Sequence, residues 1–567
     1  MAPYQNYQAE RFDDVRKLYH TAAKKYGEKT LFLQKNNTGL REIRYRDFGR
    51  DVDALATALY AHALDGKRIL LIGENRWEWA LAYLAVACSG TVVPLDPTLD
   101  AEALASLARF CDADAVIFSA HAKAKVDTLD ADVLRIAFSD LPAWVEEGRL
   151  LLQAGDRSYL DALIDPNAMC ALLFTSGTLA TPKGVMLSHR NLCFNVCEMS
   201  KMVYIGDQDV FLSVLPLHHV YESTCGLLCP LSRGATVAYG GGLPQLSQDL
   251  PSVRPTVMLC VPLLIETFYQ KIELNIRRQH MERKVAAAIK SSNAVGNAEL
   301  RQRIKRGLFP HIHKSFGGRL RLLLSGGAST DPTAAQGLRD LGIAVLQGYG
   351  LTECSPLVAL NRDTFYRNDS AGMATPNTLL DVYDPQDDGT GEIRCKGDQV
   401  MLGYFKDPLQ TAKVIRNGWF YTGDLGHIDP DGFLFLTGRK KNGIVTHDGR
   451  TVYPEELETL LLRNRFVKEA VVVGLMLPYK HHPRLVAVIF PDFDELGRAL
   501  GAKFTHAQLD LELKKAISDV NSAVSPYKRI RDFLVRHEEF PKNTSHKIRR
   551  QGIAEEALEE YLEKMKK

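Results

Sequence analysis

The sequence predicts an α/β protein in which a large N-terminal domain, residues 1–440, precedes a small α+β domain, residues 441–567. In the first part of the chain, apolar runs alternate with helical patterns, which is typical of parallel strands covered by helices. After about residue 380 the runs become short and are separated by turn residues, which predicts antiparallel strands and hairpins. A mixed set of strands and helices beyond Arg439 predicts the small domain, with a linker near 438–442.

The predicted strands and helices follow one another along the chain. The apolar runs that predict strands in the large domain are RILLIG (68–73), TVVPL (91–95), AVIF (115–118), ALLF (171–174), VMLCV (257–261), RLRLLL (319–324) and AVLQ (344–347). Helical patterns at 76–88 and 101–110 separate the first three of them. In the small domain, strands are predicted at 469–475, 485–490 and 532–535, and helices near 508–524 and at the charged C-terminus.

The composition is that of a folded globular protein. Apolar residues make up 46% and charged residues 24% of the 567 residues, which excludes a disordered or fibrous chain. Lys and Arg number 70 against 68 Asp and Glu, so no global positive field favours nucleic acid. No apolar run reaches the roughly 18–20 residues of a membrane span. The polar N-terminus predicts neither a secretory signal nor a transit peptide, and the ten cysteines predict buried thiols in the cytoplasm.

One segment, residues 271–316, is both helical in pattern and strongly basic. It contains eleven Lys or Arg against three Glu. Such a helix can contact anionic lipid or the phosphates of a ligand, and we take it as a candidate for peripheral contact with the inner face of a membrane. The alternative is a solvated helical face on an insertion.

The loop FTSGTLATPKG, residues 174–184, carries the strongest local signal for chemistry. It follows an apolar strand and contains hydroxyls, two glycines and a lysine. Small residues let backbone N–H groups approach phosphate oxygens, while hydroxyls and a cation bind them. It is not a Walker A loop, because no Ser or Thr follows Lys183. The loop predicts phosphate binding, with an ordinary surface turn as the alternative.

Four further loops carry groups suited to the rest of a nucleotide. QGYGLTE (347–353) offers an aromatic face for a base and an acid for a hard cation. GWFYTGD ends at Asp424, whose carboxylate can accept hydrogen bonds from both ribose hydroxyls. GRKKN (438–442) places cations at the domain boundary, and PKNTSHKIRR (541–550) places a lysine in a polar loop. Each alone is also compatible with a solvated loop.

In order and spacing these motifs resemble the adenylate-forming superfamily of acyl-CoA synthetases, adenylation domains and luciferases. The resemblance runs from about residue 12 to the end and is greatest to long-chain fatty acid–CoA ligases. It includes GENRWEW (73–79), LPLHHVYE (215–222) and the basic helical insertion. It implies a distorted β-barrel-like subdomain in the large domain and a mobile small domain. It also implies activation of a medium- to long-chain fatty acid by MgATP to acyl-AMP, followed by transfer to coenzyme A.

The resemblance also implies roles for particular residues. The phosphates would be held by Thr175, Ser176, Gly177, Thr178 and Lys183, and Mg²⁺ by Thr178 and Glu353. The base would lie against Tyr349, Gly327 and Ala328, with Gly348, Gly350 and Thr352 of the same motif nearby, and Asp424 and Arg439 would fix the ribose. His219 would lie by the acyl carboxylate. Electrostatic stabilisation of the phosphates by the cation is the physical basis of such catalysis.

The resemblance implies that one site is used twice through rotation of the small domain. Lys547 would bridge the carboxylate and the α-phosphate in the first step and then move away. Lys441 would lie at the hinge, and Gly449 would face the pantetheine channel in the second step.

The departures of the chain from the family pattern include changes in two motifs. Leu179 and Ala180 replace the usual Thr and Gly of the phosphate loop, and His546 replaces the glycine before Lys547. If the lost glycine needs a positive φ, alanine there costs on the order of 1 kcal/mol. Two other functions stay open: loading of a carrier-protein phosphopantetheine in place of CoA, and a non-catalytic nucleotide- or acyl-binding protein.

Overall fold

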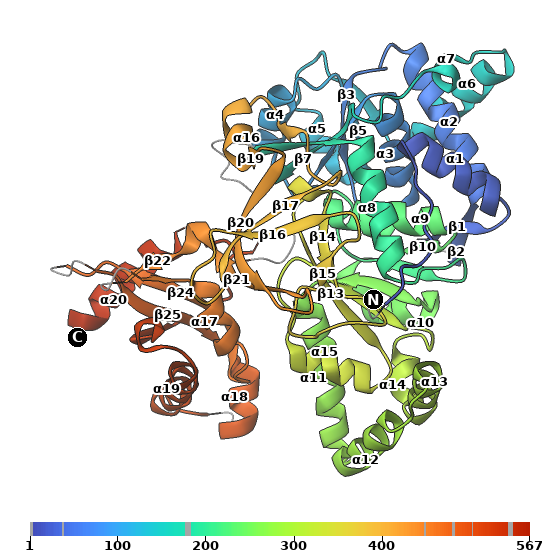
Figure 1. Ribbon diagram of the computed structural model, residues 1–567. Helices are drawn as coiled ribbons and strands as arrows, with labels where there is room; N and C mark the ends of the chain where they lie inside the picture. The colour runs from blue at the N-terminus through green and yellow to red at the C-terminus, as the bar shows by residue number, and fades with distance from the viewer. Residues whose placement is uncertain are drawn as a thin grey trace. The chain divides into compact units, whose positions relative to one another are not determined.

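The computed structural model describes residues 4–36, 39–175, 183–446, 450–478, 482–501, 503–542, 548–550 and 552–566. The chain forms two compact units (Figure 1). The large unit comprises Met1–Leu380, Cys395–Phe420 and Pro430–Leu434, and the small unit comprises Asp381–Arg394, Tyr421–Asp429 and Phe435–Lys567. The division into folding domains at residue 440 stays a prediction. No helix among the described residues is long and apolar enough to cross a membrane.

A seven-stranded sheet carries the phosphate-loop candidate of the large unit. Its order is β18-β8-β7-β4-β3-β5-β6. The strands are β3 (Arg68–Ile72), β4 (Thr91–Leu95), β5 (Ala115–Phe118), β6 (Leu134–Ala137), β7 (Met169–Thr175), β8 (Lys183–Ser188) and β18 (Gly403–Tyr404). Strands β7, β4, β3, β5 and β6 run parallel, whereas β8 and β18 are antiparallel to their neighbours. Every residue of β4 is buried, as expected of a parallel strand covered on both faces.

A nine-stranded sheet forms the second layer of the large unit, in the order β15-β14-β13-β12-β11-β9-β10-β1-β2. Its strands are β1 (Thr30–Asn36), β2 (Gly39–Arg44), β9 (Val210–Ser213), β10 (Thr236–Tyr239), β11 (Val257–Cys260), β12 (Leu322–Ser325), β13 (Ala344–Gly350), β14 (Leu357–Leu360) and β15 (Met373–Ala374). From β1 to β13 the strands are parallel. The loops that follow β9, β12 and β13 therefore leave the same edge of the sheet, where ligands collect in open α/β sheets.

Helices cover both sheets of the large unit. They include α1 (Val15–Tyr26), α2 (Tyr45–Ala61), α3 (Trp77–Ser89), α4 (Ala101–Phe110), α6 (Leu141–Gln153), α8 (His189–Met202), α9 (Cys229–Arg233), α10 (Leu246–Val253), α15 (Pro332–Asp340) and α16 (Pro408–Val414). Every residue of helix α3 except Glu78 is buried, which fits its largely apolar sequence. All ten cysteines are buried and unbridged, as the sequence predicts.

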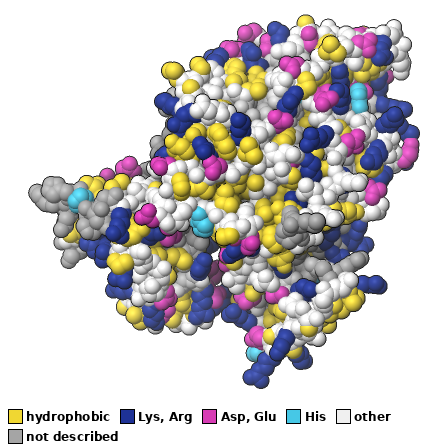
Figure 2. Space-filling model, viewed as in Figure 1, with side chains coloured by type: hydrophobic (Ala, Val, Ile, Leu, Met, Phe, Trp, Pro, Cys, Tyr) yellow, Lys and Arg dark blue, Asp and Glu magenta, His cyan; other side chains and the backbone are white. Residues whose placement is uncertain are grey.

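The basic segment between β11 and β12 is helical, as predicted. It forms α11 (Pro262–Arg278), α12 (Glu282–Asn293), α13 (Ala298–Leu308) and α14 (Pro310–Ser315). Lys and Arg side chains gather over the outer end of this segment, around the position of α12 (Figure 2). Its arginines Arg277, Arg278 and Arg283 are exposed.

The small unit contains a three-stranded sheet of β24 (Val467–Leu475), β25 (Arg484–Pro491) and β26 (Asp532–Val535). Alternate residues of β24 face two separate apolar clusters. Val472 packs in a cluster with residues of α17 (Pro454–Leu461) and α19 (His506–Ala523). Val471 and Val473 pack in a cluster with residues of α20 (Ile553–Lys566). Helices therefore cover both faces, which confirms the predicted α+β arrangement.

A five-stranded sheet follows the two large sheets in the chain, in the order β16-β17-β20-β19 with β21 paired to β20. The strands are β16 (Leu379–Tyr383), β17 (Gly391–Lys396), β19 (Ile415–Arg416), β20 (Trp419–Ile428) and β21 (Leu434–Arg439). The α/β class is confirmed. The described strands of this region form an open sheet and not a closed barrel, so the barrel-like feature implied by the resemblance reduces to an open antiparallel sheet.

Candidate active site

The two ends of the phosphate-loop candidate lie opposite each other on a hairpin. Thr175 ends β7 and pairs with Lys183, the first residue of β8. The next pair is Phe174 and Gly184, where a Cβ atom would lie 2.9 Å from the side chain of Leu172. A larger residue at this position would require the Leu172 side chain to move, so the backbone beside the loop passes close to the core. Residues 176–182, with the predicted Ser176, Gly177 and Thr178 and the departures Leu179 and Ala180, lie outside the described residues.

Tyr404 connects Lys183 to the predicted cation ligand Glu353. The Tyr404 hydroxyl donates a hydrogen bond of 2.8 Å to Glu353 Oε1. The Lys183 ammonium lies 5.5 Å from the centroid of the Tyr404 ring. Burial, with the Glu353 carboxylate as the second cause, raises the pKa of the Tyr404 hydroxyl, so that it remains a proton donor. The structure thus brings together two residues that the sequence predicts and one that it does not.

The loop after β12 is joined to the neighbouring strand β13. Gln347 Oε1 accepts a hydrogen bond of 2.9 Å from the Thr330 N–H. Gly327, in the same loop, has φ of 94°, and both Gly327 and Ala328 are exposed. Tyr349 is buried at the end of β13. The predicted base-binding residues therefore lie in the loop after β12 and at the end of the neighbouring strand β13.

The glycines on either side of Tyr349 are closely packed, and at position 350 a side chain would clash with the backbone. A Cβ atom on Gly350 would lie 1.8 Å from the Pro356 carbonyl oxygen, and one on Gly348 would lie 3.0 Å from Leu360. Thr352 follows in the short 3₁₀ helix η4 (Thr352–Cys354) and is half-buried. The GYG pattern therefore also has a packing role between β13 and β14.

Asn75 holds the loop that carries His219. Its side-chain amide donates to Ser213 Oγ at 2.9 Å and to the Leu215 carbonyl oxygen at 2.6 Å, and its side-chain oxygen accepts from the Leu217 N–H at 3.0 Å. A three-bond clip of this kind orders a loop that has no strand or helix of its own.

His219 is half-buried and lies against a second histidine. The rings of His218 and His219 are 4.3 Å apart. Burial, together with the neighbouring His219, lowers the pKa of His218 to about 3, so this ring is neutral at pH 7. The π-helix η2 (Tyr221–Leu228) follows at once, and π-helical turns are frequent at functional sites.

The predicted ribose ligands of the small unit form an ion pair. Arg439 Nε, on β21, lies 2.9 Å from Asp424 Oδ1, on β20. Beside them, Lys440 Nζ lies 2.8 Å from Glu392 Oε2. Lys441 belongs to the 3₁₀ helix η5 (Lys440–Asn442), so the predicted linker is a strand end followed by one tight turn. Gly449 and Lys547 lie outside the described residues.

A family model for AMP-binding enzymes matches residues 19–405. The chain belongs to this family. A long-chain-fatty-acid–CoA ligase, FadD15 of Mycobacterium bovis, is 30% identical over 86% of each chain. A chloroplastic long-chain-fatty-acid–[acyl-carrier-protein] ligase of Arabidopsis thaliana, AEE15, is 26% identical over 90% of this chain and 81% of its own. ATP-bound MatB from Rhodopseudomonas palustris shares the fold with a TM-score of 0.74 and 23% identity over 97% of this chain and 100% of its own.

In this AMP-binding enzyme, the sequence did not indicate the residues that position the predicted site residues. Tyr404 and Asn75 act through their contacts with Glu353 and with the His219 loop. Tyr221 supports the exposed loop after β12, because a Cβ atom on Gly326 would lie 2.9 Å from its ring and its hydroxyl donates to the Leu324 carbonyl oxygen. Asn75 and Tyr221 lay in stretches already singled out, GENRWEW and LPLHHVYE, and nothing there indicated their partners.

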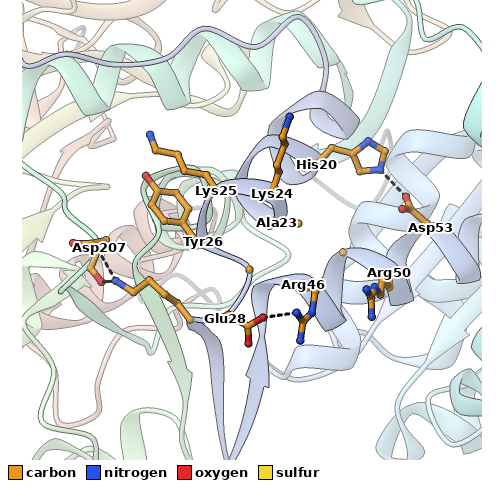
Figure 3. Close-up of a pocket in the computed structure, with 13 residues that line it drawn as sticks. His20, Ala23, Lys24, Lys25, Tyr26, Glu28, Arg46, Arg50, Asp53 and Asp207 are labelled. Carbon is orange, nitrogen blue, oxygen red and sulfur yellow. Dashed lines mark hydrogen bonds and ion pairs between the residues drawn. The ribbon is translucent and has the colours of Figure 1, made fainter.

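A pocket of about 830 Å³ lies away from all these residues, at the end of α1 and the start of α2 (Figure 3). Its acidic side chains are already engaged. His20 lies 2.8 Å from Asp53, and Lys29 lies 2.8 Å from Asp207. It contains none of the predicted site residues of this AMP-binding enzyme, so we do not assign the active site to it.

Proposed function

We propose that the chain is an AMP-forming ligase that converts a medium- to long-chain fatty acid to its acyl-CoA thioester. The observation that carries this proposal is the 30% identity to a long-chain-fatty-acid–CoA ligase over 86% of both chains. In the first step a carboxylate oxygen attacks the α-phosphorus of ATP, and the bond to pyrophosphate breaks. In the second step the CoA sulfur attacks the acyl carbonyl, AMP leaves, and the thiol proton passes to solvent.

We assign the phosphates to Thr175, Lys183 and the loop between them. A hard cation fits beside Glu353, because carboxylate and hydroxyl oxygens are the ligands that Mg²⁺ prefers, and nucleotide-bound Mg²⁺ takes only one or two carboxylates from the protein. We assign this cation to Glu353 and Thr178. When bound, Mg²⁺ neutralises charge on the phosphates during displacement.

The remaining assignments follow the family motifs. Tyr349, with Gly327, Ala328, Gly348, Gly350 and Thr352 around it, would hold the base, and Asp424 and Arg439 the ribose. His219 would lie beside the acyl carboxylate. Lys547 would act in the first step only, with Lys441 as the hinge and Gly449 facing pantetheine in the second.

The test is pyrophosphate release with MgATP across a series of fatty acids, each with and without CoA. We expect release that needs a long acyl chain and continuous turnover only with CoA. A burst of one equivalent that CoA cannot turn over would contradict the proposed acceptor. No release with any acid would contradict ligase activity and favour a non-catalytic nucleotide-binding protein.

A carrier-protein acceptor is the second candidate, because one relative is named as an acyl-carrier-protein ligase. The two functions differ in one observable. Thioester formation with free CoA and no protein partner supports the CoA ligase. Transfer to a phosphopantetheinylated carrier protein, with none to CoA, supports the alternative.

We further propose that the basic helices α11–α14 contact an anionic membrane surface peripherally. A basic exposed helix is attracted to anionic headgroups. The proposed fatty-acid substrate of the enzyme partitions into lipid. Sedimentation with vesicles of phosphatidylserine and phosphatidylcholine at low salt tests this. The double variant R283Q/K284Q on α12 should weaken binding, whereas K514Q/K515Q on α19 should not. Absence of wild-type binding to these vesicles would refute the proposal.

A further inference from the structure

A short strap, defined here as residues 398–405, joins the phosphate hairpin to the Glu353 loop. On one side, the Leu402 N–H donates to the Met186 carbonyl oxygen at 2.9 Å, and the Phe405 N–H donates to the Gly184 carbonyl oxygen at 2.8 Å. On the other side, the Met401 N–H donates to the Glu353 carbonyl oxygen at 2.8 Å. The strap therefore fixes the backbone of β8 relative to that of Glu353.

Tyr404 is the side chain of the strap that contacts both functional residues. It is 6% exposed, and its N–H donates to Thr411 Oγ1 at 2.8 Å. Its hydroxyl reaches Glu353 Oε1 at 2.8 Å, while the Lys183 ammonium lies over its ring at 5.5 Å. Because backbone and side chain are both held, the ring has little freedom to leave Glu353.

We propose that Tyr404 is the positioning residue for the metal–nucleotide complex. By occupying one carboxylate oxygen of Glu353, its hydroxyl directs the second oxygen to the cation. The Lys183 ammonium lies over its ring, and this cation–π contact keeps the ammonium near the phosphates. This inference rests on the proposed function of Glu353 and Lys183. Tyr404 itself contacts neither the metal nor the reacting atoms.

The first test measures Mn²⁺ binding to the protein in the presence of ATP, by electron paramagnetic resonance, without any catalytic turnover. The variant Y404F removes the hydroxyl and keeps the ring. We expect the affinity for Mn²⁺–ATP to fall about tenfold, the change expected for a hydrogen bond to a charged group. The KM for MgATP should rise in parallel, while the KM for the fatty acid and the melting temperature should stay unchanged.

The matched control is Y19F. Tyr19 is a buried tyrosine of the same unit whose hydroxyl donates to Asp53 Oδ1 at 2.7 Å. This variant should leave Mn²⁺–ATP binding unchanged. In an E353Q background, Y404F should add less than a twofold loss, because a residue that acts through Glu353 has no further effect once that carboxylate is gone. If Y404F does not fold, T411V should give a smaller loss in the same direction. It removes the acceptor of the Tyr404 N–H, together with the hydrogen bond that the Thr411 hydroxyl donates to the Asp407 carbonyl oxygen, and leaves the Tyr404 side chain in place.

The outcomes separate this inference from the proposed function. Wild-type binding of Mn²⁺–ATP by Y404F, or an undiminished effect of Y404F in the E353Q background, would overturn the role of Tyr404. A wild-type protein that binds no Mn²⁺–ATP and releases no pyrophosphate would instead overturn the proposed function.

Discussion

Arg439 Nε, at the end of β21, lies 2.9 Å from Asp424 Oδ1, inside the neighbouring strand β20 of the open sheet. The Asp424 side chain is 8% exposed and that of Arg439 is 47% exposed. A buried carboxylate is costly unless it is paired, and its arginine partner supplies that pair. A carboxylate accepts hydrogen bonds at both of its oxygens, which is the chemistry that the proposed ribose site needs for two vicinal hydroxyls.

We predict that D424N weakens ATP binding about tenfold, because the amide accepts fewer hydrogen bonds and leaves Arg439 without its charge partner. Isothermal titration with ATP measures this. The control is D381N, which removes the partner of Arg394, whose Nε lies 2.8 Å from Asp381 Oδ2 in the same sheet. Equal loss of ATP affinity in both variants would mean that the effect is general to the sheet.

We predict that K547A abolishes acyl-adenylate formation and spares thioester formation from supplied acyl-adenylate. The reason is that its charge is needed only where the carboxylate meets the α-phosphate. The two half-reactions are measured separately, as pyrophosphate exchange and as CoA thioester formation. K564A, an exposed lysine of the C-terminal helix, serves as the control and should affect neither. Equal loss of both half-reactions in K547A would contradict the two-step use of one site.

We predict that N75A lowers the free energy of unfolding by about 1–3 kcal/mol. The variant removes the acceptor of the Leu217 N–H and the amide donor that binds Ser213 Oγ. The fatty-acid step should slow as well, since the same loop carries His219. Urea unfolding checks the first effect. N293A, whose amide meets Asp340 at the surface, should change stability by less than about 0.5 kcal/mol.

Glu222 gives a prediction for the pH dependence of stability. Its Oε1 atom accepts a hydrogen bond of 2.6 Å from Ser213 Oγ, and burial raises the pKa of the carboxyl group to about 8. The folded state therefore keeps a proton that the unfolded chain loses above its ordinary pKa. This contribution to stability is complete at low pH and is lost as the pH rises towards 8. Burial raises the pKa values of the neighbouring Tyr239 and Cys260, which stay uncharged over this range.

We predict that E222Q gains stability relative to the wild type as the pH rises from 5 to 8, by up to a few kcal/mol, since each pKa unit corresponds to about 1.4 kcal/mol. Urea unfolding at several pH values measures the difference. E146Q, at an exposed glutamate paired with Arg149, should show a constant difference from the wild type. A constant difference for E222Q as well would mean that Glu222 is already ionised in the folded protein.

Short-range patterns were enough to predict most of the elements. The runs at 91–95 and 485–490 form β4 and the centre of β25. A short, continuous apolar run indicates a strand that is buried beneath other elements of the fold. The basic segment was also correctly predicted as helical from its pattern. Such patterns could not decide whether the antiparallel region forms a closed barrel or an open sheet, because closure depends on pairing between strands far apart in the chain.

The predicted site residues were found from motifs whose chemistry is local: a glycine-bearing loop with a lysine, or an acid on a tight turn. Their supports were not predictable in this way. Tyr404 is 51 positions from Glu353, and Asn75 is 138 positions from Ser213. In each case the strand order brings the partners together, and no spacing in the chain encodes it.

The sequence by itself thus determined which residues can carry the chemistry, because side-chain type and local backbone freedom are written in neighbouring positions. Only the tertiary structure decided which of them are held in place, and by what. Strap residues 398–405 follow β17 in the chain but pair with β8 and the Glu353 loop. The physical reason is that a hydrogen bond of 2.8 Å requires a position in space, which the packing of the whole sheet fixes.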